Sequence, residues 1–113
     1  MSIFTIKQGD LLPAIAATLM EGVGTVNEGP APVTDADTVK FLMRRIGETT
    51  PTVNAAADWA DQPASQVRYA WVSGDTATAG TYECEWEVTW PSGKKMTFPS
   101  AGYDTVRIFD DIA

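Results

Sequence analysis

Three glutamates at every second position are the residues of this sequence with the spacing closest to a catalytic group. Glu83, Glu85 and Glu87 stand in the run "TYECEWEVTW". On an extended strand they would lie about 7 Å apart on one face. A glycosidase uses two carboxylates roughly 5 to 9.5 Å apart and keeps one in an apolar pocket, which a row on an open sheet face lacks. We interpret the three as solvated carboxylates that face cations on neighbouring strands. The candidate cations are Lys40, Arg44, Arg68 and Lys94.

Other groups that could do chemistry are few. Histidine is absent, which removes the commonest general base and metal ligand, and Cys84 is the only cysteine. Several acidic pairs could offer oxygen ligands to calcium, but none has the spacing of a recognised calcium loop. The pairs are Asp35 with Asp37, Asp58 with Asp61, and Asp110 with Asp111. We therefore predict a protein that is not an enzyme, with no catalytic, cofactor-binding or metal site.

Composition places the chain among ordinary globular proteins. Its 113 residues fit one domain, residues 1–113, with 44% hydrophobic and 20% charged residues. The formal net charge of −7 would repel a phosphate backbone, so we do not expect a nucleic-acid partner. No apolar run approaches the roughly 20 residues of a membrane span, and the start "MSIFTIKQGD" lacks the pattern of a secretion signal. We expect synthesis in the cytoplasm and no membrane contact.

Alternation of apolar and polar residues predicts β-strands throughout. A helix at Leu11–Met20 is the alternative for one segment, but Pro13 and β-branched residues weaken it. Glu21–Asp37 is rich in Gly, Pro and acid and reads as a long irregular excursion with one short strand at Val23–Val26. The fold prediction is all-β, an immunoglobulin-like antiparallel β-sandwich of seven or eight strands. The expected strands are Ser2–Lys7, Pro13–Met20, Thr38–Arg45, Thr52–Trp59, one that carries Val67, Tyr69 and Trp71, Thr81–Trp90, Lys94–Phe98 and Tyr103–Phe109.

The spacing of Tyr82 and Cys84 suggests a structural corner. In antibody-like sandwiches a tyrosine two residues before a cysteine bonds through its hydroxyl to the backbone of the preceding connection. Here that acceptor should lie within Asp75–Gly80, and Cys84, which has no disulfide partner, should be a small buried residue. We expect Tyr69, Trp71 and Trp86 to complete the core around this corner.

Four tryptophans, Trp59, Trp71, Trp86 and Trp90, could form an aromatic binding platform or pack in the core. Each falls on the inward side of its expected strand, which favours core packing. Trp90 precedes the hairpin turn at Pro91–Gly93 and is the best candidate for partial exposure.

Four segments of the chain together resemble a known family. They are "FTIKQGDLLPAIAATL", "VKFLMRR", "VRYAWVSGDTATAGTYECEWEVTWPSGKKMTFP" and "YDTVRI", and the most specific part is Val67–Pro99. Together they resemble the N-terminal domain family of phage baseplate upper proteins, whose members also occur as small free-standing phage proteins. The residues that carry the resemblance are Tyr69, Trp71, Gly74, Asp75, Thr76, Gly80, Tyr82, Glu85, Gly93 and Pro99.

This resemblance implies a non-catalytic virion protein with an immunoglobulin-like sandwich, made in the host cytoplasm and held in the particle by other phage proteins. The partners would be capsid or tail and baseplate proteins, and a homo-oligomer is compatible with that role. We expect attachment through a strand edge or loop surface, with Ser2–Lys7 and Glu21–Asp37 as candidates. The alternative function is an adhesin-like domain that binds a host-surface glycan through Trp90.

Overall fold

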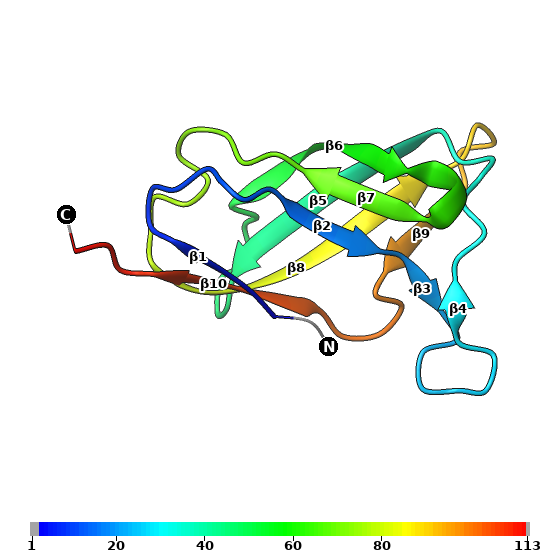
Figure 1. Ribbon diagram of the computed structural model, residues 1–113, viewed down its shortest axis with the longest axis horizontal. Coiled ribbons are helices and arrows are strands. Elements are labelled where there is room, and N and C mark those ends of the chain that lie inside the picture. The colour runs from blue at the N-terminus through cyan, green and yellow to red at the C-terminus, as the bar shows by residue number, and fades with distance from the viewer. Residues whose placement is uncertain (1–2, 113) are drawn as a thin grey trace.

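The computed structural model describes residues 3–112 and shows an all-β protein (Figure 1). No α-helix forms among these residues, so the alternative helix at Leu11–Met20 is excluded. The elements in chain order are β1 (Ile3–Lys7), β2 (Ile15–Thr18), β3 (Met20–Glu21), β4 (Gly29–Pro30), β5 (Thr38–Arg45), β6 (Val53–Asp61), the 3₁₀ turn η1 (Gln62–Ala64), β7 (Gln66–Tyr69), β8 (Gly80–Thr89), β9 (Lys95–Phe98) and β10 (Asp104–Phe109).

Eight of the described strands form one strongly curled sheet that folds over itself like a sandwich, and β3 and β4 form a separate two-stranded sheet. The order of the curled sheet is β1-β10-β8-β5-β6-β7-β2, and β9 pairs with β8 beside the start of β10. The strand β6 joins the two layers, because Val53–Ala57 pair with β5 whereas Asp58–Asp61 pair with β7 across a register shift. Figure 1 shows β7 and β2 lying across β5 and β8. The prediction of an all-β, sandwich-like fold is confirmed.

One pairing departs from the antiparallel expectation. The strand β1 runs parallel to β10, with Ile3 opposite Thr105 and Lys7 opposite Phe109. All other pairs among the described strands are antiparallel. The two outermost strands of the order, β1 and β2, are joined by the short connection 8–14, which carries the chain from one layer to the other.

The core lies between the layers and is built from the alternate residues that the sequence pattern marked as apolar. The expected strand Thr38–Arg45 is β5 without change, and Val39, Phe41 and Met43 are buried on its inner face. The same alternation holds on β8, where the inner residues are Tyr82, Cys84, Trp86 and Val88. Burial of these side chains is the main favourable term in folding.

The segment after β2 differs most from its prediction. Val23–Val26 do not form a strand; they lie at the tip of a hairpin whose strands are β3 and β4. Two turn hydrogen bonds shape this tip, from Thr25 N–H to Gly22 O and from Glu28 N–H to Thr25 O. Gly22 has φ +65°, and a Cβ there would lie 2.8 Å from the Asn27 carbonyl oxygen, so the tip requires glycine.

Smaller differences concern strand ends. The expected first strand began at Ser2, which lies outside the described residues, and Trp71 lies beyond the end of β7 although it is buried. Apolar Pro13 and Leu19 flank β2 rather than belong to it. Strand ends depend on hydrogen bonding, which the alternation of side chains does not report.

Candidate functional site

The three glutamates lie on the outer face of β8, as the alternation predicts. In the register of β5 with β8, Arg44 lies opposite Glu83 and Lys40 opposite Glu87. Glu83 Oε1 is 3.7 Å from Arg44 Nε, and Glu87 Oε1 is 3.6 Å from Lys95 Nζ. Glu83 and Glu87 therefore face cations on the neighbouring strands β5 and β9, whereas Glu85 lies opposite Leu42.

Two of the expected cations are placed differently. Arg68 lies on β7 opposite Asp58 and pairs with β2 and β6, so the prediction that it faces the glutamates is wrong. Lys94 precedes β9, and its neighbour Lys95 makes the ion pair with Glu87 instead. The reason is the strand order. The strands β5 and β9 lie next to β8, whereas β7 lies in the other layer.

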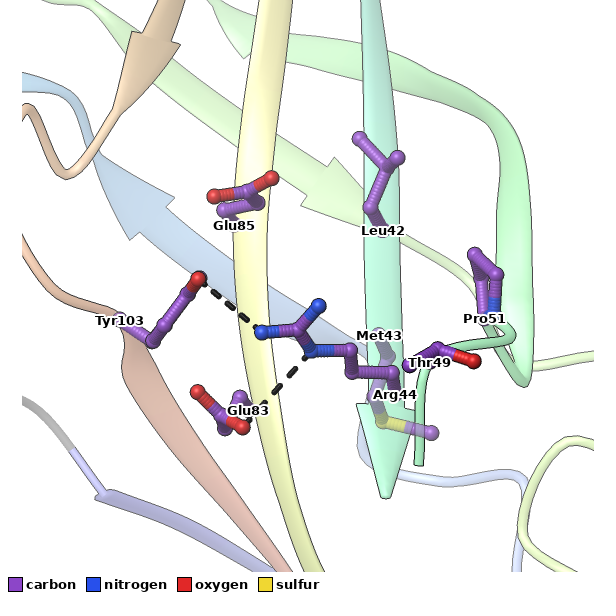
Figure 2. A pocket seen from close by; sticks show the side chains of 8 residues that line it. All are labelled: Leu42, Met43, Arg44, Thr49, Pro51, Glu83, Glu85 and Tyr103. Atoms are coloured by element: carbon purple, nitrogen blue, oxygen red, sulfur yellow. Dashed lines mark hydrogen bonds and ion pairs between the residues drawn. The ribbon is translucent and has the colours of Figure 1, made fainter. Parts of the chain in front are cut away.

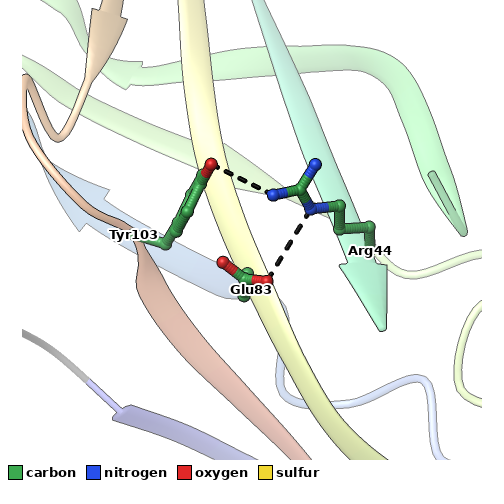
Figure 3. Close-up of polar contacts among 3 residues, drawn as sticks. All are labelled: Arg44, Glu83 and Tyr103. Carbon is green, nitrogen blue, oxygen red and sulfur yellow. Dashed lines mark hydrogen bonds and ion pairs between the residues drawn. The ribbon is translucent and has the colours of Figure 1, made fainter. Parts of the chain in front are cut away.

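Arg44 and Tyr103 build the most defined polar contact on this face (Figures 2 and 3). Arg44 Nη2 donates to the Tyr103 hydroxyl at 3.1 Å, and the guanidinium carbon lies 5.2 Å from the centre of the tyrosine ring. Figure 2 shows Glu83 and Glu85 beside this pair. These four residues belong to the lining of a hollow of about 110 Å³. The hollow is lined by Leu42, Met43, Arg44, Thr49, Pro51, Glu83, Glu85 and Tyr103.

The charged side chains at this hollow are partly exposed to water, as is usual on the outer face of a sheet. The Arg44 and Glu83 side chains are 38% and 23% exposed, so water screens their attraction. Ion pairs of this kind contribute about 0–1 kcal/mol to folding. The arrangement orders the outer face of β5 and β8, and Tyr103 ties the connection before β10 to it.

The corner tyrosine lies as predicted. The buried Tyr82 hydroxyl donates to the Thr78 carbonyl oxygen at 2.6 Å, an acceptor inside the expected segment Asp75–Gly80. Burial raises the pKa of the Tyr82 phenol. Gly80 allows Arg45 to cross this corner, because a Cβ at Gly80 would lie 2.9 Å from Arg45 Nε. The bond fixes the connection between β7 and β8 to the core.

A second tyrosine contact in the same connection was not predicted from the sequence. The Tyr69 hydroxyl donates to Asp75 Oδ2 at 2.6 Å, and the same oxygen accepts the Val72 N–H at 2.9 Å. Burial and the bond to Asp75 raise the pKa of the Tyr69 phenol. The available signal was the turn-forming pair Gly74 and Asp75 a few residues after an inward tyrosine.

Aromatic rings join the two layers next to these contacts. Phe41 on β5 lies 5.0 Å from the Tyr69 ring, 5.7 Å from Trp71 and 4.7 Å from Trp86, measured between ring centres. Trp71 also donates through Nε1 to the Pro13 carbonyl oxygen at 3.1 Å. The expected core residues Tyr69, Trp71 and Trp86 thus meet around Phe41, whose central position only the packing reveals.

Cys84 is buried between the layers, and burial raises the pKa of its thiol to about 12. We expect a thiol reagent to label native Cys84 at least about 100-fold more slowly than it labels the chain in concentrated urea. A Ser92→Cys variant, in the exposed turn Pro91–Gly93, should be labelled rapidly at its new thiol. Labelling of native Cys84 at the urea rate would contradict its burial.

The same shift gives a pH dependence of stability. The folded thiol keeps its proton up to about pH 12, whereas a thiol in the unfolded chain loses it near pH 8.5. Above that pH the unfolded state binds fewer protons, so the free energy of unfolding should fall as pH rises from about 8.5 to 12. The raised phenol pKa values of Tyr69 and Tyr82 act in the same direction at higher pH.

The acidic pairs and the remaining tryptophans have local structural contacts. Asp61 caps η1, since its carboxylate accepts the Ala64 N–H at 3.4 Å. Trp59 donates through Nε1 to the Asp37 carbonyl oxygen at 3.4 Å. Trp90 is half-buried and packs against the core. Within residues 3–112 no group of three or more acidic or cysteine side chains is arranged to hold a metal ion.

Large apolar side chains are exposed at one end of the sandwich, which we call the apolar end. Figure 1 shows there the connections β1–β2, β5–β6 and β7–β8 together with the end of β10. Backbone bonds join the β1–β2 connection to the β7–β8 connection, from Gly9 N–H to Thr76 O, and to the end of β10, from Gln8 N–H to Phe109 O. The β5–β6 connection is bonded to the start of β8, from Ile46 N–H to Thr81 O. The exposed side chains are Leu11, Leu12, Ile46, Val72 and Phe109, between 40% and 80% exposed.

A larger hollow, which we call the seam groove, lies where the curled sheet fails to close. It has a volume of about 620 Å³, within the range of ligand pockets. One wall is residues 17–20, at the end of β2, and the other is residues 98–104, from β9 to β10. Gly22, Val23 and Glu28 of the β3–β4 hairpin and Trp86 of β8 complete the lining.

Known proteins add little to these observations. No protein-family model matches the chain, and no curated protein sequence matches it. In the part of the chain that the structure describes, no helix is long and apolar enough to cross a membrane. The apolar end and the seam groove are therefore the surface features from which a function can be proposed.

Proposed function

We propose that this chain is a non-catalytic structural protein of a bacteriophage particle, in which it docks on other virion proteins of the head, tail or baseplate. The observation that carries the docking role is the apolar end. Its five large side chains sit on three connections and a strand end that hydrogen bonds hold together. Large exposed apolar side chains that gather at one end of a protein are typical of a protein contact site.

The phage assignment is supported by the residues that resemble the baseplate family. Tyr69 and Asp75 bond to each other, Tyr82 bonds to the same connection, and Trp71 packs beside them. Several residues that carry the resemblance therefore hold the β7–β8 connection in place. That connection also carries Val72 of the apolar end.

Charge and cysteine chemistry agree with assembly inside a host cell. The net charge of −7 disfavours contact with packaged nucleic acid. The fold is held by aromatic packing and corner hydrogen bonds, and its one thiol is buried, so a reducing cytoplasm suits it. We propose synthesis in the host cytoplasm and residence in the virion, with repeated copies on a symmetric lattice.

Incorporation into particles tests the proposal. A Leu12→Glu/Val72→Glu variant places two charges on the apolar end and should lower the copies per purified particle at least about tenfold. Val26→Glu is the matched control, because Val26 is fully exposed at the tip of the β3–β4 hairpin, outside the apolar end. It should incorporate like the unchanged chain. Equal incorporation of the double variant would contradict docking through the apolar end.

The alternative role, recognition of a host-surface glycan, depends on Trp90 at the β8–β9 hairpin, where its backbone N–H bonds to the Lys94 carbonyl oxygen at 2.9 Å. Its ring is only partly exposed and packs against the core, which favours the structural role. Binding on a glycan array that disappears with Trp90→Ala would support the adhesin-like function over the first proposal.

A further inference from the structure

We infer that the seam groove receives an extended, positively charged segment of another protein, which pairs with the free edge of β2 and continues the sheet. This inference rests on the proposed role as a protein-binding module. It adds a second contact surface to the apolar end and specifies how the partner binds there.

The free edge of β2 follows from its hydrogen bonds. Among the strands that the structure describes, β2 stands last in the order and pairs only with β7. The Leu19 N–H donates to the Ser65 carbonyl oxygen on the β7 side at 2.8 Å. Because backbone polar groups alternate between the two edges of a strand, those of Ala16 and Thr18 point away from β7. Thr18 lines the groove, so an extended segment placed there would meet an unpaired strand edge.

The floor of the groove suits apolar side chains of such a segment. Leu19, Trp86 and Phe98 line it, and each is only 2% exposed, so the groove reaches the core. A strand that bonds to β2 would direct every second side chain inward onto these three residues. Strand addition of this kind obtains affinity from main-chain bonds and specificity from pockets for alternate side chains.

Charge decides between the kinds of polypeptide. Among the described residues that line the groove, Glu28 and Asp104 are the charged ones, and both are acidic. A segment with lysine or arginine near its ends would be attracted to this rim. A second copy that paired edge to edge would bring two acidic rims together, and each copy carries a net charge of −7, so the two copies would repel each other. We therefore assign the groove to a different, basic partner.

Peptide titration tests the inference with the folded chain and a probe of defined sequence. The probe is the capped hexapeptide Lys-Thr-Val-Thr-Val-Lys, and the readout is the amide spectrum of ¹⁵N-labelled protein. Saturable shifts are expected at the amides of Ala16 and Thr18. A peptide with glutamate in place of both lysines should bind at least about threefold more weakly at low salt, and the difference should shrink at high salt.

Two matched variants test the edge pairing. Thr18→Pro removes an N–H that does not bond to β7, which an edge strand tolerates, and should weaken binding about five- to tenfold. Thr18→Val keeps the N–H and should bind within about twofold of the unchanged chain. Should Thr18→Pro fail to fold, a probe N-methylated at alternate residues removes the same bonds while the protein stays unchanged. Undiminished binding of that probe would overturn the inference.

Three other outcomes distinguish the groove assignment from the proposed function and from self-association. Absence of saturable shifts up to about 1 mM peptide would overturn the groove assignment, while incorporation into particles would still support the proposed function. Peptide binding without incorporation into particles would support the groove assignment and contradict the proposed function. A dimer in sedimentation analysis that Thr18→Pro abolishes would assign the edge to a second copy and overturn the choice of a basic partner.

Discussion

Replacement of Phe41 by alanine should lower the free energy of unfolding by about 3–5 kcal/mol. The Phe41 side chain is fully buried, and its ring contacts the rings of Tyr69 and Trp71 from the other layer as well as Trp86 from the neighbouring strand β8. Its removal would leave a cavity between the layers that these rings cannot fill without leaving their own contacts. Urea unfolding followed by tryptophan fluorescence measures the change.

Phe109→Ala is the matched control for this prediction. Phe109 is also a strand phenylalanine, but it is 45% exposed at the end of β10. The same chemical change there should cost about 1 kcal/mol or less, because little apolar area leaves the core. Similar costs for the two variants would show that the layers are not held together at Phe41.

Asp75→Ala should lower the free energy of unfolding by about 2–4 kcal/mol, although Asp75 is only half-buried. The substitution removes the acceptor of the Tyr69 hydroxyl and of the Val72 N–H. The buried phenol would then lack a partner, and the β7–β8 connection would lose one of the contacts that hold it, while the Tyr82 bond to Thr78 would remain. The measurement is again the midpoint and slope of urea unfolding.

A double-mutant cycle with Tyr69→Phe isolates the hydroxyl–carboxylate bond. We expect a coupling energy of about 1–2 kcal/mol between the two positions. Asp35→Ala, at an exposed loop acid, should change stability by less than about 0.5 kcal/mol. Strict additivity of Asp75→Ala and Tyr69→Phe would mean that the bond contributes nothing to folding.

Strand alternation predicted most of this fold because each strand buries one face. Thr38–Arg45 shows the pattern at its clearest, since Val39, Phe41 and Met43 all point to the core. The β3–β4 hairpin was missed because turn hydrogen bonds and the positive φ of Gly22 shape it, and the valines at its tip do not pack. The predicted short strand at Val23–Val26 was therefore wrong, because its apolar residues are exposed.

Contacts between distant strands were the least predictable part. The partners of the β8 glutamates depend on which strands flank β8, so Arg44 was expected correctly and Arg68 was not. Tyr82 could be predicted because its acceptor lies only four residues away. The seam groove depends on which strand edges remain unpaired once the sheet has curled, and no pattern along the sequence reports that.

The most direct measurement of the central proposal is quantitative mass spectrometry of phage particles purified from a lysate in which this chain is produced. The proposal predicts that the chain sediments with the particles at a fixed number of copies per particle and is depleted from the lysate supernatant. Its complete retention in the supernatant, with particles that carry none of it, would contradict the assignment as a virion protein.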